Sequence, residues 1–168
     1  MKKLALTDFA KYRYPSALEL SPDGRYLTFA LKEVDREGDG YRWNLWLYDL
    51  ESRESRQITQ GDDQRKAVWE DNTHILYKTT ELDEAMRARG FEEEWTVYHR
   101  LNVCTGEECE AFRLPMSVSG LWKMDEGRYV FTGETHLDRP NLLELTGEAL
   151  EKELVRRQQT KGYKVLTE

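Results

Sequence analysis

The stretch that decides the fold covers residues 18–30 and reads Leu-Glu-Leu-Ser-Pro-Asp-Gly-Arg-Tyr-Leu-Thr-Phe-Ala. On both sides of a polar centre the apolar residues recur at every second position, which is the period of a β-strand. The centre has the composition of a tight turn, because Pro22 fixes its own φ, Asp23 bonds neighbouring backbone and Gly24 tolerates a positive φ. The stretch therefore predicts a β-hairpin.

This hairpin recurs along the chain. Residues 119–132 align without a gap on residues 16–29 and share a Gly-Arg-Tyr at the turn. A less regular copy with a shorter turn occupies residues 67–77. A second hairpin repeats as well, since residues 47–54 align with residues 101–108. Repeats of about 50 residues, each made of several short strands, are typical of β-propeller blades.

Composition restricts the class of protein. A chain of 168 residues is the size of one domain or a piece of one. Its formal net charge of −7 argues against nucleic acid or an anionic membrane as a partner, because both bind basic surfaces. No apolar run approaches the roughly 20 residues of a membrane span, and the apolar part of the N-terminus is too short for a signal peptide. We therefore expect a cytoplasmic protein with no nucleic-acid and no membrane partner.

These patterns predict an all-β fold, an incomplete β-propeller with about three blades of antiparallel strands in a single domain over residues 1–168. The expected parts are a lead-in over residues 1–15, a first blade over 16–62, a second blade over 63–115 and an incomplete third blade over 116–168. Strands are expected at residues 16–20, 25–33, 43–49, 55–60, 65–69, 74–79, 95–103, 109–113, 118–123, 128–134 and 163–166.

Two helical insertions interrupt this pattern. The first, within residues 81–94 of the second blade, is predicted to be a short helix with an Asp83–Arg87 pair and Gly90 at its end. The second covers residues 145–159 of the third blade. It carries an apolar stripe and the favourable i,i+4 pair Glu153–Arg157, which together indicate an amphipathic helix.

Two tryptophans occupy the predicted third strands of the first two blades. Trp46 lies in a strand whose residues are apolar on both faces, whereas a strand with one face in water alternates apolar and polar residues. Trp95 begins the corresponding strand of the second blade. Because a blade packs between two neighbouring blades, we expect both tryptophans to be buried between blades.

Three motifs follow one another in the first blade: Ser21-Pro22-Asp23-Gly24-Arg25, Asn44-Leu45-Trp46-Leu47-Tyr48-Asp49 and Arg56-Gln57-Ile58-Thr59-Gln60-Gly61. In this order they resemble the N-terminal propeller of the prolyl oligopeptidase family, nearest its acylaminoacyl-peptidase branch. The late helix followed by Tyr163-Lys164-Val165-Leu166 is also similar to that branch. The first motif is shared with periplasmic TolB-like propellers. The resemblance implies that an α/β-hydrolase domain carrying Ser, Asp and His follows the propeller.

We expect no catalytic domain in this chain. The sequence has no Gly-x-Ser-x-Gly, the strand–turn–helix motif that exposes the nucleophilic serine of such hydrolases. The histidines His74, His99 and His136 lie in different repeat segments, with no acid at a motif spacing. His99 falls on the apolar face of its strand and is expected to be a hydrogen-bonded structural histidine rather than a catalytic base. We therefore assign no catalytic residue and expect no cofactor.

The two cysteines flank a hairpin tip. Cys104 and Cys109 can face each other across the strands within reach of a disulfide, or supply half of a zinc site. No second pair of cysteines exists, and the cytoplasm is reducing. Two free thiols and no metal site are therefore expected.

Glu92, Glu93 and Glu94 form the one candidate recognition feature, between Phe91 and Trp95 in the insertion of the second blade. In the dipeptidyl-peptidase relatives of the family, glutamates of a propeller insertion hold the N-terminal ammonium of the substrate. Carboxylates suit an ammonium because they form charge-assisted hydrogen bonds with it. The alternative is a solvated acidic face. Acylaminoacyl peptidases take blocked N-termini and need no such glutamates.

The resemblance thus predicts the N-terminal part of a propeller that restricts access to a serine peptidase, with the peptide substrate cleaved in a hydrolase domain outside these residues. The alternative is a stand-alone TolB-like propeller module that binds protein partners.

An arc of three blades has two faces without a neighbouring blade. Each face would expose large apolar side chains of the kind at Trp43, Leu45, Val97 and Leu101. Large exposed apolar patches mark association sites, and two arcs related by a two-fold axis would cover them. The pattern predicts self-association as a dimer. The alternative is that the helix at residues 145–159 folds back over one face.

Overall fold

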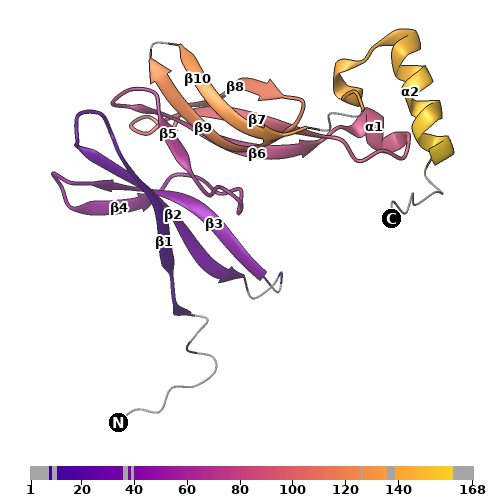
Figure 1. The fold of residues 1–168 in the computed structure, drawn as a ribbon. Coiled ribbons are helices and arrows are strands. Elements are labelled where there is room, and N and C mark those ends of the chain that lie inside the picture. Colours follow the sequence, from indigo (N-terminus) through magenta and orange to yellow (C-terminus); the bar gives the residue numbers. More distant parts are fainter. Residues whose placement is uncertain are drawn as a thin grey trace, which may run out of the picture.

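The computed structural model describes residues 8, 11–35, 38, 40–125, 127–135 and 139–160. Among these residues, three antiparallel sheets follow one another along the chain, and two helices lie together beyond the ends of β6 and β7 (Figure 1). The first sheet has the order β1-β2-β3-β4 and consists of β1 (Tyr14–Leu20), β2 (Tyr26–Asp35), β3 (Gly40–Asp49) and β4 (Glu54–Gln57).

The second sheet repeats this order. It consists of β5 (Ala67–Trp69), β6 (His74–Leu82), β7 (Glu94–Asn102) and β8 (Glu108–Leu114). The third sheet has two strands, β9 (Ser117–Asp125) and β10 (Arg128–Glu134). These strands lie within a few residues of the predicted positions. The prediction of an all-β, incomplete propeller with about three blades is confirmed. The predicted strand at residues 163–166 and most of the lead-in lie outside the described residues.

The β1–β2 turn is formed by the polar residues and the glycine from which it was predicted. The Ser21 hydroxyl donates to Asp23 Oδ1 over 2.6 Å, and the Ser21 Oγ in turn accepts from the Tyr26 amide. Gly24 has a φ of 72°, a conformation that costs glycine little. The shorter β5–β6 turn uses Asp71 instead, whose Oδ1 accepts from the amides of Thr73 and His74. The Asp71 carboxylate, which accepts from the backbone amides two and three residues later, thus takes the place that Gly24 has in the longer β1–β2 turn.

The sheets pack face to face through two apolar clusters. The cluster between the first and second sheets consists of Ala30, Leu45, Leu47, Ala67, Trp69, Ile75, Tyr77, Leu101 and Val103. The cluster between the second and third sheets is built on Leu76, Tyr98, Val118 and Leu121. The second sheet therefore has a buried face on each side, which is the arrangement expected for a blade between two neighbours.

The predicted burial of Trp46 and Trp95 between blades is wrong, because both side chains are only half-buried. Successive side chains of a strand point to opposite faces. Leu45 and Leu47 face the second sheet and are buried, so Trp46 lies on the outer face of the first sheet, stacked on Phe29. Trp95 donates its Nε1–H to Asp83 Oδ2 over 2.9 Å, which fixes it at the end of the second sheet where β7 begins. The buried tryptophan is Trp69.

The helices form a unit of their own. Helix α1 (Glu84–Ala88) lies in the predicted insertion of the second blade, and a 3-10 helix (Leu142–Glu144) precedes helix α2 (Gly147–Thr160). The two helical segments meet through the apolar cluster of Met86, Phe91, Leu142 and Leu154. The Asp83 carboxylate caps α1 by accepting from the Met86 amide, while Arg87 pairs with Glu84. The predicted Asp83–Arg87 side-chain pair is therefore replaced by a helix cap.

Glu70 links the second and third sheets. Its side chain is 11% exposed, and its carboxylate accepts hydrogen bonds from the Arg100 guanidinium and, over 2.5 Å, from the Tyr129 hydroxyl. Lys123 donates to the Glu70 carbonyl oxygen. Burial acts to raise the pKa of Glu70, but the hydrogen bonds from Arg100 and Tyr129 and the charge of the guanidinium hold this pKa below its usual value of 4.5.

Candidate functional site

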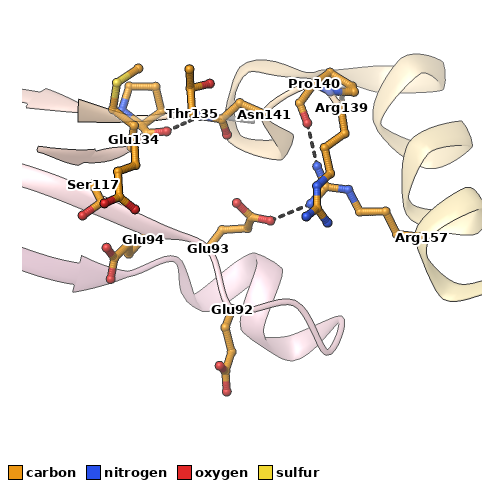
Figure 2. A pocket seen from close by; sticks show the side chains of 12 residues that line it. Glu92, Glu93, Glu94, Ser117, Glu134, Thr135, Arg139, Pro140, Asn141 and Arg157 are labelled. Carbon is orange, nitrogen blue, oxygen red and sulfur yellow. Dashed lines mark hydrogen bonds and ion pairs between the residues drawn. The ribbon is translucent and has the colours of Figure 1, made fainter. Parts of the chain in front are cut away.

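An open pocket of about 400 Å³ lies where β7 and β9 begin and β10 ends, beside the segment that leads into α2 (Figure 2). All three glutamates singled out in the sequence line it. The full lining consists of Glu92, Glu93, Glu94, Pro115, Met116, Ser117, Glu134, Thr135, Arg139, Pro140, Asn141 and Arg157. The pocket therefore joins the insertion of the second blade to residues of the third sheet and of α2.

Arg157 closes one side of the pocket. Its Nη1 lies 2.9 Å from Glu93 Oε1, its Nη2 donates to the Pro140 carbonyl oxygen over 2.6 Å, and its Nε donates to Glu153 Oε1 over 3.0 Å. The Arg157 side chain is 15% exposed. A planar guanidinium with three partners in fixed directions has one orientation. Glu93 is thus already engaged by a cation of the chain itself.

Glu153 anchors Arg157 from within α2. Hydrogen bonds from Arg156 and Arg157, acting against burial, lower the pKa of Glu153 to about 2. The predicted i,i+4 pair Glu153–Arg157 is therefore confirmed. A second ion pair, Arg89–Glu151, joins the end of α1 to α2 with an Nη1–Oε1 distance of 2.9 Å.

Opposite charges occupy opposite sides of the pocket. Figure 2 shows Glu94, Glu134 and Ser117 on one side and Arg139 and Arg157 on the other. Among the described residues, none donates a hydrogen bond to the carboxylate of Glu94 or Glu134. Glu92 is exposed, and its side chain points away from the others in Figure 2. The acidic side can accept an ammonium or guanidinium group, and Arg139 offers donors to an anionic group on the other side.

The segment before α2 is positioned by Asn141. Its amide nitrogen donates to the Pro115 carbonyl oxygen, and its Oδ1 caps the 3-10 helix by accepting from the Leu143 amide over 2.9 Å. Sequence reasoning missed Glu134, Arg139 and Asn141 as pocket residues. Their chain positions carry no spacing that relates them to Glu92–Glu94. Besides the run Glu92–Glu94, the helical pair of Arg157 with Glu153 was the one local signal at this site.

The other residues considered from the sequence have structural roles. The ring of His99 stacks on Tyr77, and its Nε2 lies 2.9 Å from the Thr79 hydroxyl, as expected for a hydrogen-bonded structural histidine. His74 Nδ1 lies 2.9 Å from Asp71 Oδ2 in the β5–β6 turn. His136 is outside the described residues.

Cys104 and Cys109 are exposed and are not joined by a disulfide. In the described part of the chain, no group of three His, Cys, Asp or Glu side chains is placed to hold a metal ion. No described helix is long and apolar enough to cross a membrane.

Several solved structures are similar to this chain, whereas no protein-family model and no curated protein sequence matches it. The β-propeller domain of the Trilobed protease from Pyrococcus furiosus, which has an open velcro topology, is 14% identical over 73% of this chain and has a TM-score of 0.52. The Pyrococcus horikoshii acylaminoacyl peptidase is 15% identical over 74% of the chain, with a TM-score of 0.55. The AtxE2 isopeptidase in its apo form is 14% identical over 90%, with a TM-score of 0.55.

These likenesses show the fold. The chain spans 34%, 18% and 24% of the lengths of these three structures, in the order given. It therefore has the fold of part of a β-propeller, and these three structures are peptidases by name, in agreement with the resemblance read from the sequence.

Proposed function

We propose that this chain is the propeller part of a serine peptidase of the prolyl oligopeptidase type, nearest the acylaminoacyl peptidases, and that it restricts which peptides reach the catalytic domain. The observation that carries the proposal is the fold, since a propeller domain of a protease and an acylaminoacyl peptidase share it. The ordered motifs of the first blade support the same family. A propeller fits this role because blades that bury apolar clusters between them form a rigid wall around an opening.

The chain itself is proposed to be non-catalytic. Its sequence has no Gly-x-Ser-x-Gly. His74 and His99, the candidate bases among the described residues, are both hydrogen-bonded to neighbours in their own sheet. The nucleophile, base and acid would then come from an α/β-hydrolase domain encoded beyond Glu168. The DNA downstream of this codon tests the proposal. A reading frame with Gly-x-Ser-x-Gly supports it, and an in-frame stop codon contradicts it.

The purified 168-residue chain is expected to leave acetyl-alanyl and aminoacyl chromogenic esters uncleaved, because no serine is held in a nucleophile elbow. The measurement is the rate of chromophore release against a protein-free blank. A parallel sample treated with a serine-directed phosphonate is the control. Cleavage that the phosphonate abolishes would show that the chain has a catalytic site of its own.

We further propose that the pocket contributes to substrate recognition by receiving the N-terminal ammonium of a peptide, a preference in which this chain would differ from the acylaminoacyl peptidases, since these take blocked N-termini. The pocket, lined by Glu92, Glu93 and Glu94, is the observation that favours this role. Glu94 and Glu134 are the carboxylates on its acidic side, whereas Glu93 is paired with Arg157. An ammonium between two carboxylates forms charge-assisted hydrogen bonds that an acetylated N-terminus cannot form.

A short peptide with a free N-terminus is expected to bind the chain about tenfold more tightly than the same peptide with an acetylated N-terminus. Isothermal titration with the two peptides measures the difference. Glu94→Gln should abolish the preference, while Glu148→Gln serves as the matched control because Glu148 is exposed and does not line the pocket. Equal affinity for both peptides, or tighter binding of the acetylated one, would refute the ammonium role and leave the propeller assignment intact.

A further inference from the structure

The pocket keeps charged groups of both signs without a partner. Glu93 is already paired with Arg157. In the part of the chain that the structure describes, no ion pair or side-chain hydrogen bond involves Glu94, Glu134 or Arg139. The two carboxylates lie on one side of the pocket, and the Arg139 guanidinium lies on the other (Figure 2). The pocket therefore offers an acceptor side and a donor side to one ligand.

Strand pairing holds the acidic side in place. Glu94 is the first residue of β7, and Glu134 is the last residue of β10, where it pairs with Ser117 of β9. The Thr96 hydroxyl donates to the Met116 carbonyl oxygen over 2.7 Å, which ties the start of β9 to β7. The backbones that carry the two carboxylates are therefore fixed relative to each other, and a site built on strands is more precise than one built on loops.

Two anchored residues follow Arg139 and position the basic side. The Pro140 carbonyl oxygen accepts from Arg157 Nη2 over 2.6 Å. The side-chain amide of Asn141 donates to the Pro115 carbonyl oxygen. A guanidinium presents a planar fork of donors that matches a carboxylate in two parallel hydrogen bonds. Arg139 is thus placed to receive a carboxylate from a ligand in the pocket.

The size of the pocket limits the length of the ligand. Its volume of about 400 Å³ equals that of a sphere roughly 9 Å across, and an extended peptide covers about 3.3–3.6 Å per residue. Two or three residues are therefore enough to reach from one side of the pocket to the other. The ammonium and the carboxylate of a longer extended peptide lie too far apart to meet both sides at once.

We propose that the pocket binds a whole di- or tripeptide as a zwitterion, with its ammonium between Glu94 and Glu134 and its C-terminal carboxylate on Arg139. The inference rests on the ammonium role proposed above and adds the second end of the peptide. Such a ligand carries one charge of each sign, so its binding gives both unpaired sides of the pocket a partner. A pocket that contacts both ends selects for the length of the peptide as well as for its free end groups.

Isothermal titration with peptides that differ only at the C-terminus tests this inference. With the full chain, amidating the C-terminus of the tripeptide Ala-Ser-Ala should weaken binding about tenfold, because the neutral amide cannot pair with the charge of Arg139. In Arg139→Gln the same amidation should change the affinity less than about twofold. Arg53→Gln is the matched control and should keep the full effect, since Arg53 is exposed in the β3–β4 turn and does not line the pocket. Circular dichroism melts check that both variants are folded.

A longer peptide tests the length limit without any variant. Amidating the pentapeptide Ala-Ser-Ala-Ser-Ala should change its affinity less than about twofold, because its carboxylate cannot reach Arg139 while its ammonium lies between Glu94 and Glu134. An effect as large as that on the tripeptide overturns the inference, and so does an effect that persists in Arg139→Gln. If N-terminal acetylation weakens binding and amidation does not, this inference fails and the ammonium role stands. If neither change weakens binding, both fail.

Discussion

Replacing Leu45 by alanine is expected to lower the free energy of unfolding by about 3–4 kcal/mol. Leu45 is fully buried in the cluster between the first and second sheets, where it packs with residues such as Leu47 and Ile75. Truncation removes buried methyl groups and leaves a cavity between two sheets whose backbones are fixed by their own hydrogen bonds. Urea denaturation followed by circular dichroism measures the change.

Trp46→Ala is the matched comparison, because Trp46 is the next residue on the same strand. Its side chain is larger, yet it is half-buried on the outer face against Phe29. We expect it to cost roughly half as much as Leu45→Ala, since less apolar surface returns to water. A larger loss for Trp46→Ala than for Leu45→Ala would mean that the two faces of β3 are assigned the wrong way round.

Glu70→Gln is expected to lower the free energy of unfolding by about 2 kcal/mol at pH 7. The change keeps the shape of the side chain but leaves Arg100 with a neutral acceptor, and it weakens the hydrogen bond from the Tyr129 hydroxyl. Arg100 belongs to the second sheet and Tyr129 to the third, so the loss of their shared acceptor weakens the contact between these two sheets. Glu51→Gln is the control, because Glu51 is exposed and makes one contact at 3.5 Å. It should change stability by less than about 0.5 kcal/mol.

The Glu70 link also has a pH dependence of known sign. The pKa of Glu70 is lower in the folded chain than its usual 4.5, so the carboxylate form stabilises the fold. This contribution is complete above the unfolded pKa and is lost as the pH falls through the folded pKa. The stability difference between the original chain and Glu70→Gln should therefore shrink as the pH falls below about 4.5. A difference that stays constant from pH 7 to pH 3 would contradict the ion pair.

Local residue patterns were sufficient to predict the strands and their turns. Ser21, Asp23 and Gly24 form the β1–β2 turn through contacts within five residues, so the sequence carries the whole cause. Local residue patterns do not decide which face of a strand becomes buried. The strand around Trp46 is apolar on both faces, and which face meets another sheet depends on the neighbours in the arc. The burial of Trp46 was therefore predicted wrongly, although the strand itself was predicted correctly.

Only part of the candidate site could be predicted from the sequence, because some of its residues meet through tertiary packing. Glu92, Glu93 and Glu94 are adjacent in sequence, so their gathering at one pocket needed no tertiary information. Glu134 and Arg157 reach the pocket from segments whose approach depends on how the third sheet and α2 pack. The pairing of Glu93 with Arg157 joins residues 64 positions apart, and no local period encodes such a contact.

The contact between the helices has a consequence for the order of folding. Each sheet is made of strands that are neighbours in sequence, so its pairing closes short loops and can begin as soon as one hairpin exists. The ion pairs of α2 with the insertion join residues 62 and 64 positions apart, and they need both the second and the third sheets to be in place. The helical unit is therefore expected to form last. By the same reasoning it is the first part to open in the folded protein, so amides of α2 should exchange with solvent before those of β6 and β7.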